Sequence, residues 1–258
     1  PWASHALGGA DGSSASSRRV ADPRLINLSA EAEVVHAGAD EVDPNAFYFD
    51  PSEPECWLVA ERIIATLGAP AAWTPIAVPA EQDAVGQLAP GVGDSAQETP
   101  REIQDESRRL RSGDRQDRGI QGQSISAIAV ERRLLEFKPP SGWLEGEDLF
   151  SREALLAATF AKQAGKTVAF VLALMRQTWC AGRDPRDMTT IYLAGAAAEV
   201  HPNALEKAMG LKSLNAELDR TTEAAGVAGV TSVPTVRIGT DLYTGDAGLD
   251  DAAKAVGA

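Results

Sequence analysis

The sequence predicts an α/β fold with one sheet and a large helical insertion, and three observations carry this prediction. A strand, a helix and a strand follow one another between residues 47 and 78, a helical block occupies residues 151–225, and a hairpin with a closing helix occupies residues 233–256. The 258 residues are enough for one sizeable core and such an insertion.

The first strand, helix and strand have clear boundary residues. Phe47–Phe49 form a short aromatic run that is typical of a strand, and Asp50–Ser52 break it and can cap a helix. A helix is predicted over Pro54–Leu67, because proline is favoured in the first turn and a glycine follows the last residue. Ala72–Val78 is predicted as a second strand, in which Pro75 is tolerated only near an edge or a bulge.

Helical periodicity dominates the second half of the chain. Four helices are predicted there, over Ser151–Ala164, Thr167–Ala181, Met188–Val200 and Asn203–Ala225. The period then changes to that of strands, and a hairpin and a final helix are predicted over Val233–Ile238, Leu242–Thr244 and Leu249–Val256.

The other regions lack a sustained period. Residues 1–45 are rich in Ala, Gly, Ser and Asp, so we expect a mostly flexible extension. Residues 79–122 are polar, and their arginines are interleaved with acidic residues. This pattern favours a solvated helix face or a mobile loop over a basic patch.

Composition excludes several classes of function. The net charge is −13, with 37 acidic against 24 basic residues, which argues against binding nucleic acid or an anionic membrane surface. The longest apolar run, Val168–Met175, is too short to cross a bilayer, and residues 1–19 lack the apolar stretch of a secretory signal. Only two cysteines occur, Cys56 and Cys180, and the three histidines are far apart. We expect a cytoplasmic protein without a disulfide framework or a metal site.

Two segments carry a family resemblance. Residues 47–57 read Phe-Tyr-Phe-Asp-Pro-Ser-Glu-Pro-Glu-Cys-Trp, and residues 229–236 read Gly-Val-Thr-Ser-Val-Pro-Thr-Val. The first resembles the strand-to-helix segment of DsbA-family thioredoxin-fold proteins, which ends in Cys-Pro-x-Cys-Trp or begins a helix with Ser-Pro. The second is similar to their cis-proline segment. The family includes 2-hydroxychromene-2-carboxylate isomerases and kappa-class glutathione transferases.

The resemblance covers residues 46–258. It implies a thioredoxin-like domain made of residues 46–80 and 201–258, with residues 81–200 as a mainly helical insertion. It also implies a cis bond between Val233 and Pro234 opposite the active site, which would leave the backbone of Val233 free to pair with a substrate. The structural alternative is a trans-proline that begins an edge strand.

The redox pair of this fold is missing. The resemblance places the attacking thiol at Glu53 and the second thiol at Cys56, whereas a working site needs two thiols, the first with a pKa lowered by the helix N-terminus. Ser52, one position early, could replace a catalytic serine only if the backbone shifted. We expect no dithiol redox chemistry.

Glu53 has three interpretations. It can be a carboxylate that merely favours the helix N-terminus after the chemistry was lost. It can be a general acid or base, which requires burial to raise a pKa that the helix N-terminus lowers. Its charge can also mimic the thiolate and hold a cationic or hydrogen-bonding ligand.

Further candidate residues surround this point. Asp50 is first a capping residue and second a functional carboxylate, and Trp57 is either a core aromatic or part of a pocket. After the last strand, kappa-type glutathione binders resemble Gly-Ser-Asp-Arg, whereas residues 245–248 here read Gly-Asp-Ala-Gly. Asp246 is the shifted acceptor and the arginine is absent, so a glutathione site of the usual kind is not expected. No cofactor is indicated beyond a low-molecular-weight thiol.

The leading hypothesis is an isomerase- or transferase-type enzyme that acts on a small aromatic or conjugated molecule. Its catalytic candidates are Ser52, Glu53 and Cys56, with Asp50, Trp57, Val233, Pro234 and Asp246 as substrate-binding candidates. The alternatives are a non-catalytic binding module and a single-cysteine oxidoreductase, which needs an accessible Cys56. A pocket that encloses Glu53 favours the enzyme, and an open Glu53 favours the binding module. The sequence leaves a monomer and a homodimer open.

Overall fold

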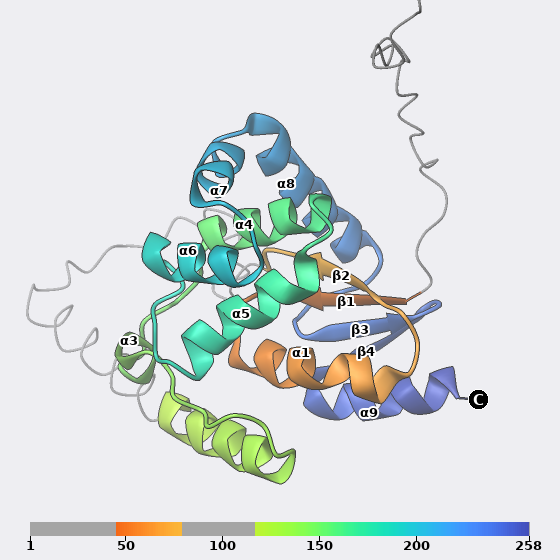
Figure 1. Cartoon of the computed structure of the whole chain (residues 1–258). Coiled ribbons are helices and arrows are strands. Elements are labelled where there is room, and N and C mark those ends of the chain that lie inside the picture. Colours follow the sequence, from red (N-terminus) through yellow and green to blue (C-terminus); the bar gives the residue numbers. More distant parts are fainter. Residues whose placement is uncertain (1–44, 79–116, 258) are drawn as a thin grey trace, which may run out of the picture. The chain divides into compact units, whose positions relative to one another are not determined.

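The computed structural model describes residues 45–78 and 117–257 of the chain (Figure 1). The expected N-terminal extension, and most of the polar segment 79–122, lie outside the described residues.

Four strands form one mixed sheet in the order β2-β1-β3-β4. β1 (Asn45–Phe49) runs parallel to β2 (Ala72–Pro75) and antiparallel to β3 (Thr235–Ile238). β3 pairs with β4 (Asp241–Thr244) in a hairpin. The strands before and after the helical block therefore share one sheet, which confirms the prediction.

β2 is an edge strand and is shorter than the predicted range Ala72–Val78. The edge position accommodates Pro75, as expected, because an edge residue can lack a ladder hydrogen bond. Pro75 pairs with Phe49, the last residue of β1. One further hydrogen bond follows, from Ile76 N–H to the Phe49 carbonyl at 3.1 Å. β2 ends here because β1 offers no partner beyond Phe49.

Helix α1 (Pro54–Leu67) has the predicted bounds. Gly68 ends it with φ 68°, a left-handed conformation that favours glycine. The buried face of α1 includes Cys56, Trp57 and Ile63, so the helix is anchored in the main core.

The helical block contains one break that the sequence analysis missed. A single helix predicted over Asn203–Ala225 is wrong, because Gly210 ends one helix and Leu211, in an extended conformation, precedes the next. Glycine is a poor helix former, and the Asn215 side chain donates to the carbonyls of Met209 and Leu211 on either side of the break. The helices that complete this part of the fold are α3 (Ser141–Leu144), α4 (Arg152–Gln163), α5 (Thr167–Trp179), α6 (Met188–Ala197), α7 (Pro202–Met209), α8 (Lys212–Val227) and α9 (Gly245–Val256).

Residues 117–131 are also helical. The sequence analysis predicted a solvated helix face or a mobile loop up to residue 122 and no helix for residues 123–131. Ile125 and Ala129 are buried and Ile128 is partly buried, a spacing of three and four residues that places them on one face. The polar composition of the flanks concealed this short apolar stripe.

The helices lie on both sides of the sheet. In Figure 1, α1 and α9 run side by side below the sheet, and α4 and α8 lie above it. α5 packs against both α1 and α4, which joins the helical block to the sheet domain.

An aromatic cluster fills the space between α1 and the helical block. Phe137 stacks between Trp57 and Trp179, with ring centroids 6.0 and 6.1 Å away, and Trp143 meets Trp179 edge-on at 5.8 Å. All three tryptophans are fully buried or nearly so. This aromatic cluster supports the beginning of α1, where the candidate site lies.

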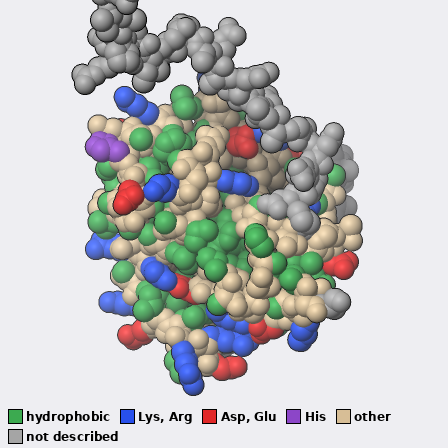
Figure 2. All heavy atoms as spheres, turned by 45° about the vertical axis from the view of Figure 1, so that its right-hand side comes forward, with side chains coloured by type: hydrophobic (Ala, Val, Ile, Leu, Met, Phe, Trp, Pro, Cys, Tyr) green, Lys and Arg blue, Asp and Glu red, His purple; other side chains and the backbone are tan. Residues whose placement is uncertain are grey.

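The surface mixes charges and apolar side chains. On the face in Figure 2, basic side chains stand among acidic ones, and apolar side chains gather near its middle. Within residues 45–78 and 117–257, none of the helices combines the length and apolar character needed to span a membrane.

Candidate functional site

The turn before α1 is built by Asp50. Its Oδ1 accepts a hydrogen bond of 2.8 Å from the Ser52 N–H, and its carbonyl accepts one of 3.2 Å from the Glu53 N–H. Glu53 is the N-cap residue of α1 but makes no side-chain capping bond, and Pro54 occupies the first turn. Asp50 therefore organises the turn rather than capping the helix, as Asp side chains do in Asx-turns.

The helical block fixes this turn from outside. The indole Nε1 of Trp179, at the end of α5, donates a hydrogen bond of 3.0 Å to the carbonyl of Pro51. The backbone of Asp50, Pro51 and Ser52 is thus held between the sheet and the helical block. Asp50 and Ser52 are only 4% and 6% exposed.

Asp50 is a buried carboxyl group with an altered acidity. Its pKa is raised from 3.8 to about 7, mainly by burial and to a smaller degree by the charges of Glu53 and Asp148, while the hydrogen bonds from Ser52 lower it. The group therefore exchanges its proton close to neutral pH, which is where an acid or base is most useful.

Glu53 is partly buried at the start of α1. Burial is the main cause that raises its pKa above the usual 4.5, and the charges of Asp148 and Glu55 act in the same direction. The nearby Arg118 guanidinium lowers it. Burial thus outweighs the charge of Arg118, and the pKa of Glu53 is raised.

Cys56 does not meet the requirements for thiol chemistry. Its side chain is 0% exposed, and burial raises the thiol pKa well above the usual value, with the charge of Glu53 adding to this. A nucleophilic cysteine needs a lowered pKa and access to its partner. Cys180 is only partly buried, but burial raises its pKa to about 12.

Ser52 contributes a buried hydroxyl. Its Oγ lies close to the Asp50 carboxyl group and lowers the pKa of that group by hydrogen bonding. Together with Asp50 and Glu53, it gives three polar side chains at the beginning of α1.

Val233 and Pro234 lie at the same end of the sheet as this turn. β3 begins at Thr235, which pairs with Tyr48 near the end of the antiparallel β1. The Val233–Pro234 bond is cis, and the Pro234 carbonyl accepts a hydrogen bond of 2.9 Å from Gly245. A substrate-binding role of Val233 stays a prediction.

Two candidates have other structural roles. Trp57 is fully buried, and its Nε1 donates to Glu61 at 3.1 Å. Asp246 is bound by the guanidinium groups of Arg62 and Arg132, which also bind Asp250. These ion pairs tie α9 to α1 and to the residues after helix 117–131. The sequence analysis named Asp246 as a substrate-binding candidate, but its carboxylate already forms ion pairs with Arg62 and Arg132.

Two residues near Glu53 escaped the sequence analysis. Arg118 lies in the helix 117–131, and Asp148 lies on the exposed connection before α4. Both act on Glu53 through their charge, and Asp148 also acts on Asp50. Arg118 belongs to a run of alternating charges, so only its helical neighbours Ile125 and Ala129 could have indicated that this part of the run packs on the core.

Within the described residues, no group of His, Cys, Asp or Glu side chains could hold a metal ion.

Comparisons with known proteins find structural neighbours only. No family model and no curated protein matches the sequence. A solved 2-hydroxychromene-2-carboxylate isomerase is similar with a TM-score of 0.60 and 18% identity, covering 83% of this chain and 94% of that one. A probable DsbA oxidoreductase from Streptomyces coelicolor is similar with a TM-score of 0.55 and 13% identity, covering 82% and 87%. A putative protein disulfide isomerase from Nitrosomonas europaea has a TM-score of 0.52 and 14% identity, covering 82% and 95%. At these identities the likeness shows the fold.

Proposed function

We propose that this chain, which has the thioredoxin-like fold of DsbA-type proteins, is an isomerase-type enzyme that moves a proton within a small conjugated organic molecule. Glu53 is the general acid and base in this proposal. The observation that carries it is the carboxyl group of Glu53, partly buried at the place of the missing thiol, with its pKa raised. A raised pKa makes the carboxylate a stronger base at neutral pH.

The reaction needs no redox partner. The Glu53 carboxylate takes a proton from a carbon next to a carbonyl group, the electrons shift through the conjugated system, and a proton returns to a second atom. Electrons are neither gained nor lost. The Asp50 carboxyl group, with a pKa of about 7, is coupled to Glu53, because the charge of Glu53 raises the Asp50 pKa.

The environment of Glu53 favours this proposal over a binding module. A module that binds a partner through an open, hydrated carboxylate would keep Glu53 solvated, whereas this side chain is partly buried. Arg118, Asp148 and Glu55 act on Glu53 through their charges. Convergent polar groups with altered pKa values are typical of active sites.

The thiol-dependent alternatives find less support. A single-cysteine oxidoreductase requires an accessible Cys56, and this side chain is 0% exposed. A bound thiolate would face the carboxyl groups of Glu53 and Asp50, which repel it when ionised. We therefore propose a reaction that does not depend on glutathione.

The test measures proton exchange directly. The full chain is incubated in deuterated buffer with conjugated carbonyl compounds, including 2-hydroxychromene-2-carboxylate, the compound in the name of one structural neighbour. Absorbance reports isomerisation and NMR reports deuterium uptake, each with and without glutathione. Substitution Glu53→Gln should lower the rate by roughly 10²- to 10⁴-fold.

Glu153→Gln is the matched control, because Glu153 is an exposed carboxylate in the first turn of another helix, α4. This variant should keep the full rate. The proposal is wrong if no compound exchanges protons in the presence of the wild-type chain, or if Glu53→Gln and Glu153→Gln behave alike.

A further inference from the structure

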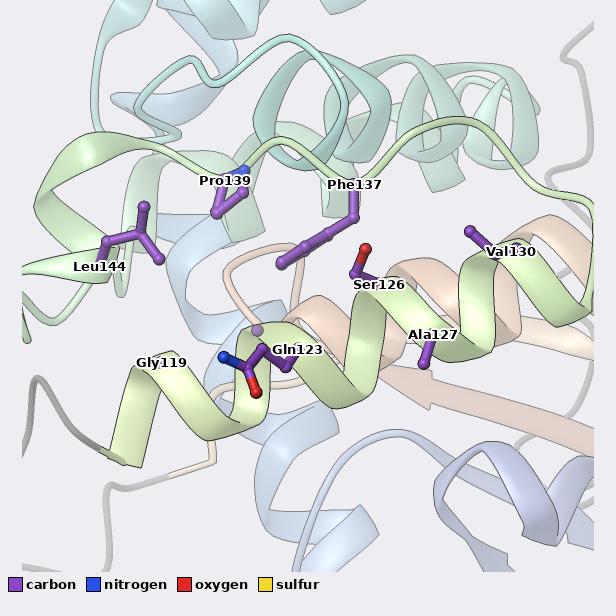
Figure 3. A pocket seen from close by; sticks show the side chains of 9 residues that line it. Gly119, Gln123, Ser126, Ala127, Val130, Phe137, Pro139 and Leu144 are labelled. Atoms are coloured by element: carbon purple, nitrogen blue, oxygen red, sulfur yellow. The ribbon is translucent and has the colours of Figure 1, made fainter.

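A groove runs along the helix 117–131, on the side that faces residues 137–144 (Figure 3). Its volume is about 660 Å³, which is within the range of roughly 300 to 1,000 Å³ that is usual for small-molecule sites. Gly122, Ser126 and Val130 line one wall at intervals of one helical turn, and Phe137 lines the other. In Figure 3 the Phe137 ring points across the groove toward the helix.

The groove is mostly apolar with a few polar groups. Gln123 and Ser126 supply an amide and a hydroxyl, and the remaining lining is made of glycine, alanine, proline and larger apolar residues. This composition is typical of sites for small organic ligands, in which apolar contacts supply affinity and a few polar groups fix the orientation.

Arg118 stands at one end of this wall. Its guanidinium carbon lies 5.1 Å from the centre of the Trp143 ring, a cation–π contact. The same ring is the nearest neighbour of Gly122, where an added Cβ would lie 3.4 Å from it. Arg118 and the groove therefore share Trp143 as a common support.

Within the described ranges 45–78 and 117–257 Arg118 makes no ion pair at 4 Å or closer, and its charge acts on Glu53 without a direct salt bridge. One of its nitrogens, Nη1, donates to the Gln121 side chain at 3.2 Å. A guanidinium carries five N–H donors and recognises carboxylates and similar anions through two of them at once. Arg118 is thus equipped to bind an anionic group.

We infer that the groove binds a flat, mostly apolar molecule with one anionic group, its apolar part against Phe137 and its anionic group at Arg118. This site goes beyond the acid–base role of Glu53. Because Arg118 also acts on Glu53, the bound molecule would be the substrate. Only this identification rests on the proposed function.

Two fluorescent probes of equal ring structure test the inference. 8-Anilinonaphthalene-1-sulfonate carries one sulfonate, and N-phenyl-1-naphthylamine is its uncharged counterpart. Both are titrated into the full chain. Arg118→Gln should weaken the binding of the sulfonate probe about tenfold and leave the uncharged probe unchanged. Ala127→Phe, at an exposed position of the groove, should weaken both.

Control variants make the result decisive. Arg183→Gln removes an exposed arginine elsewhere and should change neither affinity. Gln123→Phe provides a second groove-filling variant, and circular dichroism confirms that each variant is folded. The inference is overturned if Arg118→Gln leaves the sulfonate probe unaffected, or if folded groove-filling variants bind both probes like the wild type.

Glu53→Gln separates the two proposals. This variant should bind the uncharged probe like the wild type and the sulfonate probe at least as tightly, because a negative charge that acts on Arg118 is removed, even though proton exchange is lost. If the wild-type chain catalyses no proton exchange but binds the sulfonate probe in a way that depends on Arg118, the proposed reaction is refuted and the groove site stands. If the wild-type chain catalyses proton exchange but Arg118→Gln does not alter probe binding, the groove site is refuted and the proposed reaction stands.

Discussion

The Trp179 indole donates a hydrogen bond of 3.0 Å to the carbonyl of Pro51, a residue 128 positions earlier in the chain. The donor ends helix α5, and the acceptor lies in the turn that carries Asp50 and Ser52 into α1. This bond directly links the helical block to the backbone of the candidate site.

Trp179→Phe should therefore lower the free energy of unfolding by more than the loss of packing alone would. The buried Pro51 carbonyl would lose its partner, which costs about 1 to 3 kcal/mol in the free energy of unfolding. Urea denaturation measures the change. Trp143→Phe is the control, because the Trp143 Nε1 has no hydrogen-bond partner within the described residues. Equal losses in the two variants would contradict the role given to this bond.

Asp50→Asn should stabilise the protein at alkaline pH. In the unfolded chain the Asp50 carboxyl loses its proton near pH 3.8, whereas in the fold burial keeps its pKa at about 7. Between these values unfolding releases a proton, so wild-type stability falls as the pH rises. The shift corresponds to roughly 4 kcal/mol at full ionisation.

The gain of Asp50→Asn should accordingly be small at pH 4 and largest near pH 8, as measured by urea denaturation at several pH values. Asp187→Asn, at an exposed helix cap, is the control and should show no such trend. A constant difference between Asp50→Asn and the wild type across this range would refute the assignment of a raised pKa.

Glu53→Cys should restore a disulfide. The wild type should neither oxidise nor reduce protein disulfides at a useful rate, because the attacking thiol is missing. The variant places a thiol three residues before Cys56, at the N-cap of α1. In a Cys180→Ala background, thiol titration after mild oxidation should find no free thiol. Two free thiols would show that the site does not have redox-pair geometry. Ser52→Cys, one position early, is the control that should stay unpaired.

Asp246→Ala should destabilise the protein by removing a buried partner of two arginines. Arg62 is largely buried, and the variant leaves Asp250 as its only partner in the ion-pair network of Arg62, Arg132, Asp246 and Asp250. Breaking a buried ion pair costs on the order of 3 kcal/mol. Asp251→Ala removes an exposed partner of Lys254 and should have little effect in the same thermal or urea denaturation. Similar effects of both variants would show that the network adds little.

Local sequence patterns were sufficient where a few neighbouring residues decide the structure. Proline near the start and glycine at the end fixed the bounds of α1, because both residues restrict the backbone directly. The place of Pro75 at a sheet edge followed from its missing N–H. Position 53 is a glutamate, which cannot form a disulfide with Cys56, so residue type alone excludes a disulfide between these two positions.

Tertiary contacts decided the rest. The pKa values of Asp50 and Glu53 depend on burial, which arises only when segments that are distant in sequence pack together. The charge of Arg118 acts on Glu53 because the apolar face of the helix 117–131 packs on the core. The sequence by itself determined which side chains stand at the beginning of α1, and the tertiary structure decided which of them are buried, paired or charged, because desolvation and ion pairing arise from residues that meet only in the folded chain.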